Sequence, residues 1–371
     1  MQIWSKNLNA SSVFWGIYTD FERGGGKLAK AGALGGPPRS FSDGAALGVF
    51  LLLLPLAALG GGTREPVAVL PASPTPASGA SFSHAPAGGW DAGHTLRVLQ
   101  KDGTVQTMTV SDYLLGVVSA EMPASFEPEA LRAQAVCART YALCRAERNS
   151  HSAEGADVCA DSSCCQAYIS PADAAARWGA HASEYTAKLS AAVADTDGQV
   201  LTYGGSLIQA VFFSSAAGAT EDAAAVWGSA LPYLVSVDSP EGDEVPNYRS
   251  TVALSPDEVK ALAEGAGLGC DLSGDPAGWF SGLTRTASGR VATLSLGGVS
   301  LTGGAARNLF SLRSASFDVG YAGGAFTFSV TGYGHGVGLS QYGANAMAKE
   351  GASWRDIVEH YYTGVTIQKG I

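Results

Sequence analysis

An uncharged apolar run near the N-terminus constrains this 371-residue chain more than any other feature. No residue from Gly44 to Gly62 carries a charge, and Leu51–Leu54 lie at the centre of the run. As a helix rising 1.5 Å per residue, the run is about 28 Å long, close to the ~30 Å hydrocarbon core of a bilayer. The alternatives are a buried core helix or the hydrophobic region of a signal peptide. Core helices are usually amphipathic, whereas this run is apolar on all sides, so a transmembrane segment is favoured.

The residues before the run set its expected orientation. Lysine and arginine outnumber aspartate and glutamate in residues 1–43, which predicts a cytoplasmic N-terminus and an exported C-terminal part. The segment then acts as a signal anchor or, if it is cleaved, as a late signal peptide. We therefore predict a protein of the cell membrane with one span, whose main domain is extracytoplasmic. The predicted parts are a cytoplasmic segment 1–43, the anchor 44–62, a tether 63–94 rich in Pro, Ala, Ser and Gly, and a folded domain 95–371.

Charge and cysteine content exclude two classes of protein. The chain has 23 Lys and Arg against 33 Asp and Glu, a net charge of −10, so no basic surplus exists to neutralise the phosphates of nucleic acid. Six cysteines in a chain of this length do not make a disulfide scaffold.

Helix and strand signals alternate irregularly after residue 95. Pro128 after Glu127 predicts the first turn of an Ala-rich helix, and Ser255 with Glu258 fits a capping box. Because no regular βαβ repeat is present, we predict an α+β (irregular mixed α/β) class. We further expect the exported domain to have two lobes and a substrate cleft and to follow one transmembrane helix. The other expected elements are a hairpin at 96–110, strands within 189–213 and 283–330, a helix after Ser340 and a helix from Ser353 to Tyr362.

Two motifs suggest chemistry on a saccharide. Glu121 follows an apolar stretch and precedes Met122 and Pro123, and a carboxyl in apolar surroundings keeps its proton nearer neutral pH, as a general acid requires. The alternative is a partly exposed glutamate that closes a turn. The second motif, 332–344, has five glycines that permit close backbone approach. It carries His335, which could donate or accept a proton, and Gln341 and Tyr342, which could bind a sugar. All three are candidate substrate-binding residues. The alternative there is a tightly packed loop with a structural histidine.

A cysteine cluster and a serine pair complete the candidate sites. Cys159, Cys164 and Cys165 lie within seven residues, with His151 eight residues before the first, and zinc takes such ligands. A disulfide and unreactive buried thiols are the alternatives. The stretch 212–222 places Ser214, Ser215 and Thr220 at a predicted strand end. A serine hydrolase is disfavoured because no Gly-x-Ser-x-Gly motif is present.

Together these stretches resemble the stage II sporulation protein D family, which includes amidase-enhancer proteins. The resemblance extends over 95–371 in order. Its motifs are Tyr113-Leu114-Leu115-Gly116-Val117-Val118-Ser119-Ala120-Glu121-Met122-Pro123, Glu129 to Tyr141, Val158-Cys159, Cys165-Gln166-Ala167-Tyr168, Val226-Trp227-Gly228, Gly334 to Ala344 and His360-Tyr361-Tyr362-Thr363-Gly364.

The resemblance implies a membrane-anchored lytic transglycosylase that cleaves peptide-stripped peptidoglycan glycan during engulfment. The family's catalytic glutamate falls on Glu121, and its helix arginine falls on Arg139, which would contact substrate. The family's zinc site matches Cys159 and Cys165. Its histidine position is occupied by Ala153 here, so His151 is the predicted third ligand, with Cys164 as a substitute. The implied partners are glycan strands, a cell-wall amidase and membrane proteins of engulfment. The alternative function is a non-catalytic glycan-binding or amidase-activating module.

Overall fold

The computed structural model describes residues 89–370, which all belong to one compact unit. The predicted anchor 44–62 and the segment 1–43 lie outside the described residues. Within residues 89–370, no helix is both long enough and apolar enough to cross a bilayer.

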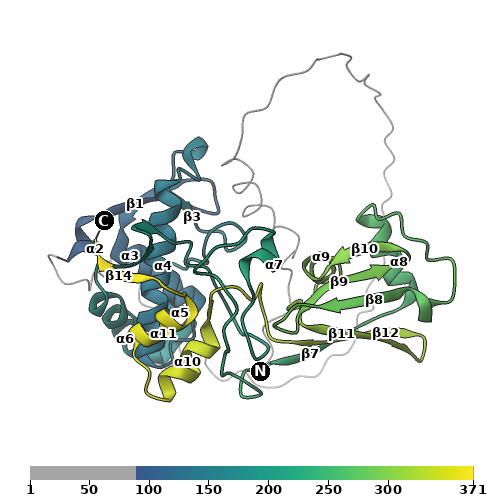
Figure 1. The fold of residues 1–371 in the computed structure, drawn as a ribbon. Helices are drawn as coiled ribbons and strands as arrows, with labels where there is room; N and C mark the ends of the chain where they lie inside the picture. The colour runs from purple at the N-terminus through teal and green to yellow at the C-terminus, as the bar shows by residue number, and fades with distance from the viewer. Residues whose placement is uncertain (1–88, 371) are drawn as a thin grey trace, which may run out of the picture. The chain divides into compact units, whose positions relative to one another are not determined.

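The architecture is mixed α/β, as predicted (Figure 1). Five small sheets have the strand orders β2-β1-β3, β14-β4-β5, β13-β6, β11-β12-β7 and β10-β9-β8. The helices are α2 (Trp90–Gly93), α3 (Val110–Glu121), α4 (Pro128–Glu147), α5 (Pro171–Trp178), α6 (Ala182–Asp195), α7 (Ala223–Trp227), α8 (Pro256–Gly265), α9 (Gly303–Leu309), α10 (Gln341–Lys349) and α11 (Trp354–Tyr361). The strands are β1 (Thr95–Leu99), β2 (Val105–Thr109), β3 (Val158–Cys159), β4 (Gln199–Tyr203), β5 (Ser206–Leu207), β6 (Phe212–Phe213), β7 (Arg249–Leu254), β8 (Phe280–Arg285), β9 (Val291–Leu296), β10 (Val299–Thr302), β11 (Phe317–Ala322), β12 (Ala325–Thr331), β13 (Leu339–Ser340) and β14 (Thr366–Lys369).

Helix α4 is the centre of the first hydrophobic cluster. It begins at Pro128 and is contacted by α3, α6, α10 and α11. Its small side chains allow these close approaches: Ala130, Ala133, Ala135 and Ala138 are fully buried. The predicted start and central position of this helix are therefore confirmed.

A second hydrophobic cluster is built by the segment 249–331. Sheets β11-β12-β7 and β10-β9-β8 lie close to α8 and α9 (Figure 1). Together these elements bury Phe317, Phe326 and Phe328. The predicted capping box at the start of α8 is present, because Ser255 accepts from the Glu258 N–H and the Glu258 carboxylate accepts from the Ser255 N–H.

Four expectations about secondary structure need correction. Residues 189–195 belong to helix α6, and the strand expected at 207–213 is divided into β5 and β6. Helix α9 interrupts the strands at 283–330, and its Thr302 side chain caps it by accepting from the Ala305 N–H. The folded domain also begins before residue 95, because α2 occupies the last residues of the predicted tether.

Helix α3 was not predicted, although it positions Glu121. Its N-terminus is capped by Thr109, whose side chain accepts from the Asp112 N–H. The helix is buried from Tyr113 through Ser119, so its sequence shows no polar face from which a helical period could be recognised.

Candidate functional site

Glu121 is the last residue of α3 and is partly buried. One carboxylate oxygen accepts from the Ala167 N–H at 2.7 Å, and the other accepts from Gln341 Nε2 at 3.3 Å. Burial raises the pKa of this carboxyl, and the two hydrogen bonds only partly oppose the shift. The helix C-terminus acts in the same direction as burial, since its partial negative charge disfavours a carboxylate.

The segment that donates to Glu121 is pinned against two helices. Gln166 Nε2 donates to the Tyr113 hydroxyl at 3.1 Å and to the Ala138 carbonyl at 3.3 Å. Gly116 permits the close approach, because a Cβ there would lie 2.3 Å from the ring of Tyr168. The Ala167 N–H is therefore held by the packing of α3 and α4.

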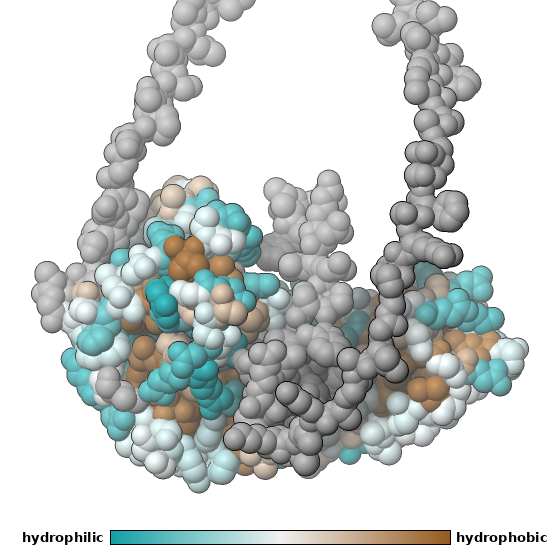
Figure 2. Space-filling view, turned by 90° about the horizontal axis from the view of Figure 1, so that it is seen from above, coloured by the Kyte–Doolittle hydropathy of each residue, from teal (hydrophilic) through white to brown (hydrophobic). Residues whose placement is uncertain are grey.

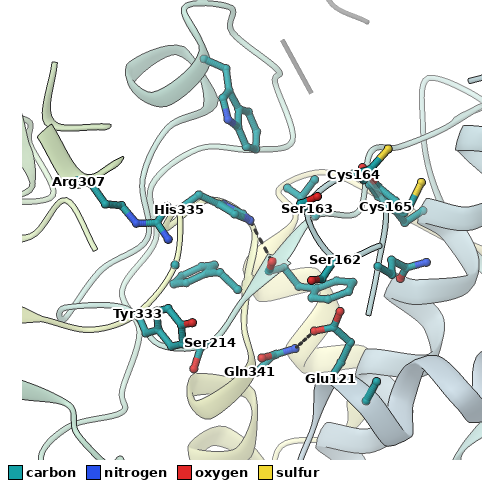
Figure 3. A pocket seen from close by; sticks show the side chains of 18 residues that line it. Glu121, Ser162, Ser163, Cys164, Cys165, Ser214, Arg307, Tyr333, His335 and Gln341 are labelled. Atoms are coloured by element: carbon teal, nitrogen blue, oxygen red, sulfur yellow. Dashed lines mark hydrogen bonds between the residues drawn. The ribbon is translucent and has the colours of Figure 1, made fainter. Parts of the chain in front are cut away.

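Two cavities meet at Glu121. The larger has a volume of about 470 Å³ and the other about 300 Å³, and both are lined by Ala120, Glu121, Ser214 and Gln341. Figure 3 shows the larger cavity, with Glu121 and Gln341 on one side and Arg307 on the other. Among the described residues that line the two cavities, Glu121 is the only one with a carboxyl group.

The Gly-rich segment 332–344 lines part of the larger cavity, together with Glu121 and Arg307. His335 Nδ1 accepts from the Val337 N–H at 3.1 Å, and Nε2 lies 3.0 Å from the Phe212 carbonyl. These partners assign a neutral ring with the proton on Nε2. Burial and the charges of Arg307 and Arg290 lower the pKa of His335 to about 3. His335 lines the cavity as a neutral ring, and the structure corrects the idea that it exchanges protons.

Ser214 and Tyr342 also reach the cavities, but two other predicted contacts do not. Ser215 is 1% exposed, and Thr220 is 1% exposed with its hydroxyl bonded to the Val237 backbone. Neither side chain lines either cavity at Glu121. The expectation that both hydroxyls bind a sugar is corrected, because the strand end turns them into the protein interior.

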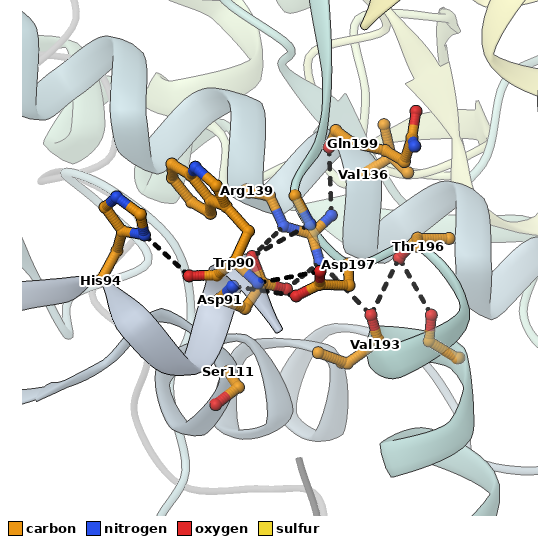
Figure 4. A network of polar contacts seen from close by, with 12 residues as sticks. Trp90, Asp91, His94, Ser111, Val136, Arg139, Val193, Thr196, Asp197 and Gln199 are labelled. Carbon is orange, nitrogen blue, oxygen red and sulfur yellow. Dashed lines mark hydrogen bonds and ion pairs between the residues drawn. The ribbon is translucent and has the colours of Figure 1, made fainter. Parts of the chain in front are cut away.

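Arg139 requires the clearest correction. Its side chain is fully buried, and its Nε and Nη2 donate to the Asp91 carboxylate at 2.8 and 2.5 Å (Figure 4). Nη1 donates to the Gln199 carbonyl at 3.1 Å. Arg139 thus joins α2, α4 and β4 instead of contacting substrate, and Asp91 in the predicted tether is its missing partner.

We expect Arg139→Ala to lower the free energy of unfolding by about 3–5 kcal/mol, because the substitution leaves the Asp91 carboxylate buried without its cation. Denaturant unfolding followed by circular dichroism measures the change. The control is Arg132→Ala, which breaks a more exposed ion pair with Asp195 and should cost about 1 kcal/mol or less. Unchanged stability combined with lost glycan affinity would return Arg139 to a substrate-binding role.

The predicted metal ligands come together. The ligand atoms of His151, Cys159, Cys164 and Cys165 all lie within 4.8 Å of one another. His151 Nε2 is 3.3 Å from the Cys165 sulfur and 3.5 Å from the Cys164 sulfur. Tetrahedral zinc with Zn–S bonds of ~2.3 Å places sulfurs roughly 3.8 Å apart, so this donor set fits a metal ion. Cys164 is an additional ligand candidate beside His151 and not a replacement for it.

The thiols of this cluster favour ionisation of one member. Hydrogen bonds from Cys159 and Cys164 lower the pKa of Cys165 to about 3. A thiolate is the form that binds a metal. None of the six cysteines of the chain, all of which lie among the described residues, forms a disulfide.

Sequence reasoning missed several residues that line the cavities. Arg307 and Tyr333 face the larger cavity, and Arg177 with Trp178 lines the smaller one. Tyr333 is 41% exposed. On the face visible in Figure 2, hydrophobic residues lie in groups among polar ones. Arg307 carries no sequence signal, because its helix α9 was not anticipated.

The described region is thus a mixed α/β domain in which a solitary carboxyl lies near a thiol-rich cluster. The family model described as "Stage II sporulation protein" matches residues 100–203. Two relatives, both named stage II sporulation protein D, are 41% identical (Bacillus amyloliquefaciens) and 40% identical (Bacillus subtilis), each over 72% of this chain and 76% of the relative. An amidase enhancer of Bacillus subtilis is 29% identical over 68% of this chain and 40% of its own length.

The two relatives named stage II sporulation protein D each match 72% of this chain. The chain belongs to the stage II sporulation protein D family.

Proposed function

We propose that this protein is a membrane-anchored lytic transglycosylase that acts on peptidoglycan glycan during sporulation. The observation that carries the proposal is the solitary carboxyl: Glu121, with its raised pKa, is the one carboxyl group among the described residues that line the two cavities. Ordinary glycosidases use two carboxyl groups. A lytic transglycosylase needs one, because a hydroxyl of the substrate replaces water as the nucleophile.

The proposed reaction uses Glu121 twice. The protonated carboxyl gives its proton to the oxygen that links N-acetylmuramic acid to N-acetylglucosamine, and the glycosidic bond breaks. The resulting carboxylate then takes the proton of the muramic C6 hydroxyl as that oxygen bonds to C1. A 1,6-anhydro ring forms, no water is consumed, and Glu121 regains its proton. Proton transfer by a positioned carboxyl contributes about 10²–10⁴-fold.

The neighbours of Glu121 support this scheme. The Ala167 N–H and the Gln341 amide orient the carboxyl and stabilise its anionic form between the two proton transfers. Cavities on both sides of Glu121 suit a strand that continues past the cleaved bond. Aromatic side chains in each, Tyr333 in the larger and Trp178 in the smaller, offer faces for sugar rings.

A metal ion would be held by His151, Cys159, Cys164 and Cys165. When bound, zinc supplies a structural crosslink, because four protein ligands leave no open position for a substrate. The crosslink would fix the chain immediately before Gln166 and Ala167, and so support the hydrogen bond to Glu121.

The localisation and partners are part of the proposal. The apolar run 44–62 would anchor the protein, with 1–43 cytoplasmic and the catalytic domain outside the cytoplasm. The stem peptides would be removed by a partner amidase, and membrane proteins of engulfment would be neighbours.

A second candidate function is a non-catalytic module that binds glycan or activates an amidase. It is favoured by the relative named amidase enhancer. One experiment separates the two: the full-length protein, purified in mild detergent, is incubated with peptide-free glycan strands, and the products are analysed by mass spectrometry. Peptide-free glycan fragments with 1,6-anhydro-muramic ends are expected. Strands that are bound but recovered intact would favour the non-catalytic module.

A further inference from the structure

Arg307 lines the larger cavity on the side opposite Glu121, and two further arginines, Arg290 and Arg313, lie close to Arg307. Arg290 is 3% exposed, and Arg307 and Arg313 are partly buried. Within residues 89–370, none of the three has a carboxylate oxygen within ion-pair distance. Buried guanidinium groups usually have such a partner, because the attraction of an opposite charge offsets the loss of hydration.

The arginines are held by neutral groups instead. Arg290 Nη2 donates to the Gly334 carbonyl at 3.0 Å, and Arg307 Nε donates to the Arg313 carbonyl at 3.2 Å. The Arg313 guanidinium lies 4.1 Å from the ring centre of Tyr333. Arg290 Nη1 is buried and has no hydrogen-bond partner. These contacts fix the positions of the guanidinium groups through neutral partners.

The acidic group beside Arg290 is Glu221, whose charge acts to raise the pKa of Arg290 and offsets part of the positive charge, but it is one carboxylate against the three guanidinium groups of the arginine cluster. The Glu221 carboxylate accepts from the hydroxyls of Thr286 and Ser288, at 2.5 and 2.6 Å, and from the Asp222 N–H. Burial and the neighbouring charge of Arg307 lower the pKa of Arg290 to about 10, so the guanidinium stays protonated near neutral pH. His335 is neutral, which leaves a net positive charge at this end of the cavity.

The cluster opens into the cavity through Arg307. Arg307 lines both the cavity of Glu121 and a smaller one of about 60 Å³, which is also lined by Arg290, Glu221 and His335. Figure 3 shows the guanidinium of Arg307 directed toward His335 and the interior of the cavity. A ligand beside Glu121 can therefore extend to Arg307, with Arg290 lying behind it.

We propose that Arg307, supported by the charge of Arg290, binds a carboxylate carried by the saccharide in this cavity. A guanidinium matches a carboxylate in shape and charge and can donate two parallel hydrogen bonds to it. This inference rests on the proposed function, under which the carboxylate is the lactyl group of muramic acid. That group is a free anion only where the stem peptide is absent, because attachment of the peptide converts it to a neutral amide. Arg307 is thus a specificity-determining residue for stripped glycan.

The test measures affinity in the full-length Glu121→Gln variant, which should bind strands without cleaving them. One ligand is peptide-free glycan, and the other is the same glycan after its carboxyl groups are coupled to methylamine. Calorimetry should show that the free carboxylate form binds about tenfold more tightly or better, as expected for charge-assisted hydrogen bonds. Adding Arg307→Gln should bring the ratio of the two affinities (free carboxylate glycan over amidated glycan) close to one. Adding Arg307→Lys instead should keep part of the preference for the free carboxylate.

The matched control adds Arg355→Gln, which removes an exposed arginine that stacks on Trp354 outside the cavities and should leave the ratio unchanged. Retained affinity of Arg307→Gln for the amidated glycan shows that this variant is folded. If the variant with Arg307→Gln binds neither glycan, the variant with Arg307→Lys decides. The proposal is overturned if its ratio of affinities for the free and the amidated glycan equals that of the Glu121→Gln variant alone. Equal affinity of the Glu121→Gln variant for both glycans also overturns the proposal.

Failure of the proposed function gives a different pattern. If the wild type leaves strands intact while the affinity ratio depends on Arg307, the carboxylate site stands and the transglycosylase is refuted. If the wild type produces anhydro ends but the two glycans bind with equal affinity, the transglycosylase stands and the carboxylate site is refuted.

Discussion

Replacing Glu121 by Gln is expected to abolish the formation of 1,6-anhydro ends from peptide-free glycan. Glutamine keeps the size of the side chain and can still accept from the Ala167 N–H, but it cannot donate a proton to the glycosidic oxygen or take one from the C6 hydroxyl. Loss of general acid–base assistance lowers rates by about 10²–10⁴-fold. No second carboxyl lines the cavities among the described residues, so no neighbour can substitute. Mass spectrometry of timed digests measures the rate.

The control for this prediction is Glu264→Gln, a substitution of the same type on the exposed side of α8. It should leave the rate unchanged. Full activity of Glu121→Gln would refute the proposed mechanism.

The pH dependence provides a further check on Glu121. Its pKa is raised in the folded protein, so the acid form persists to higher pH and activity should fall as the pH rises through that pKa. The same shift penalises the folded state above the raised pKa and has no effect below the ordinary pKa of glutamate. Glu121→Gln should therefore stabilise the protein at mildly alkaline pH but not in acid, as thermal unfolding at the two pH values would show.

Removing one thiol of the cluster formed by His151, Cys159, Cys164 and Cys165 should lower both the metal content and the stability of the protein. We expect Cys165→Ser to lose its metal, from about one zinc per chain to none, measured by elemental analysis of protein purified under reducing conditions. A metal present at a thousand times its Kd stabilises the folded state by ~4 kcal/mol, which corresponds to a fall in Tm on the order of 10 °C when it is lost. Activity should fall as well, because Ala167, which bonds Glu121, lies two residues after Cys165.

The matched variant is Cys270→Ser, which removes a thiol outside the cluster and should retain both the metal and the Tm. A wild-type protein that contains no metal, and in which a disulfide between Cys159 and Cys165 is mapped by mass spectrometry, would contradict the zinc assignment.

Local signals predicted several elements correctly. Three local features are examples: the hairpin of β1 and β2, Pro128 at the start of α4 and the Ser255–Glu258 capping box. Each depends on neighbours close in the sequence, so the chain carries it in its sequence. Helix α3 was missed for the opposite reason. It is apolar around most of its circumference because other elements cover it, and no period marks it in the sequence.

The candidate site divides in the same way. The residue types at Glu121 and at the cysteine cluster identified them before any fold was known, since carboxyl groups in apolar frames and grouped thiols have a limited range of uses. The family resemblance assigns Arg139 to substrate, and its actual partner Asp91, 48 positions earlier, lies in the predicted tether, where nothing in the sequence links the two. Arg307 was not considered, because nothing near it in the sequence places it in a cavity with Glu121.

The sequence alone determined the family, the mixed α/β class, the candidate glutamate and the residue types of a candidate metal site, because these depend on local chemistry. Only the tertiary structure decided which side chains face the cavities. Burial neutralises His335, Asp91 pairs with Arg139, and Gln341 lies beside Glu121 although 220 positions separate them. Such contacts arise from chain packing over long separations, and the free energy of a buried charge depends on the partners that this packing supplies.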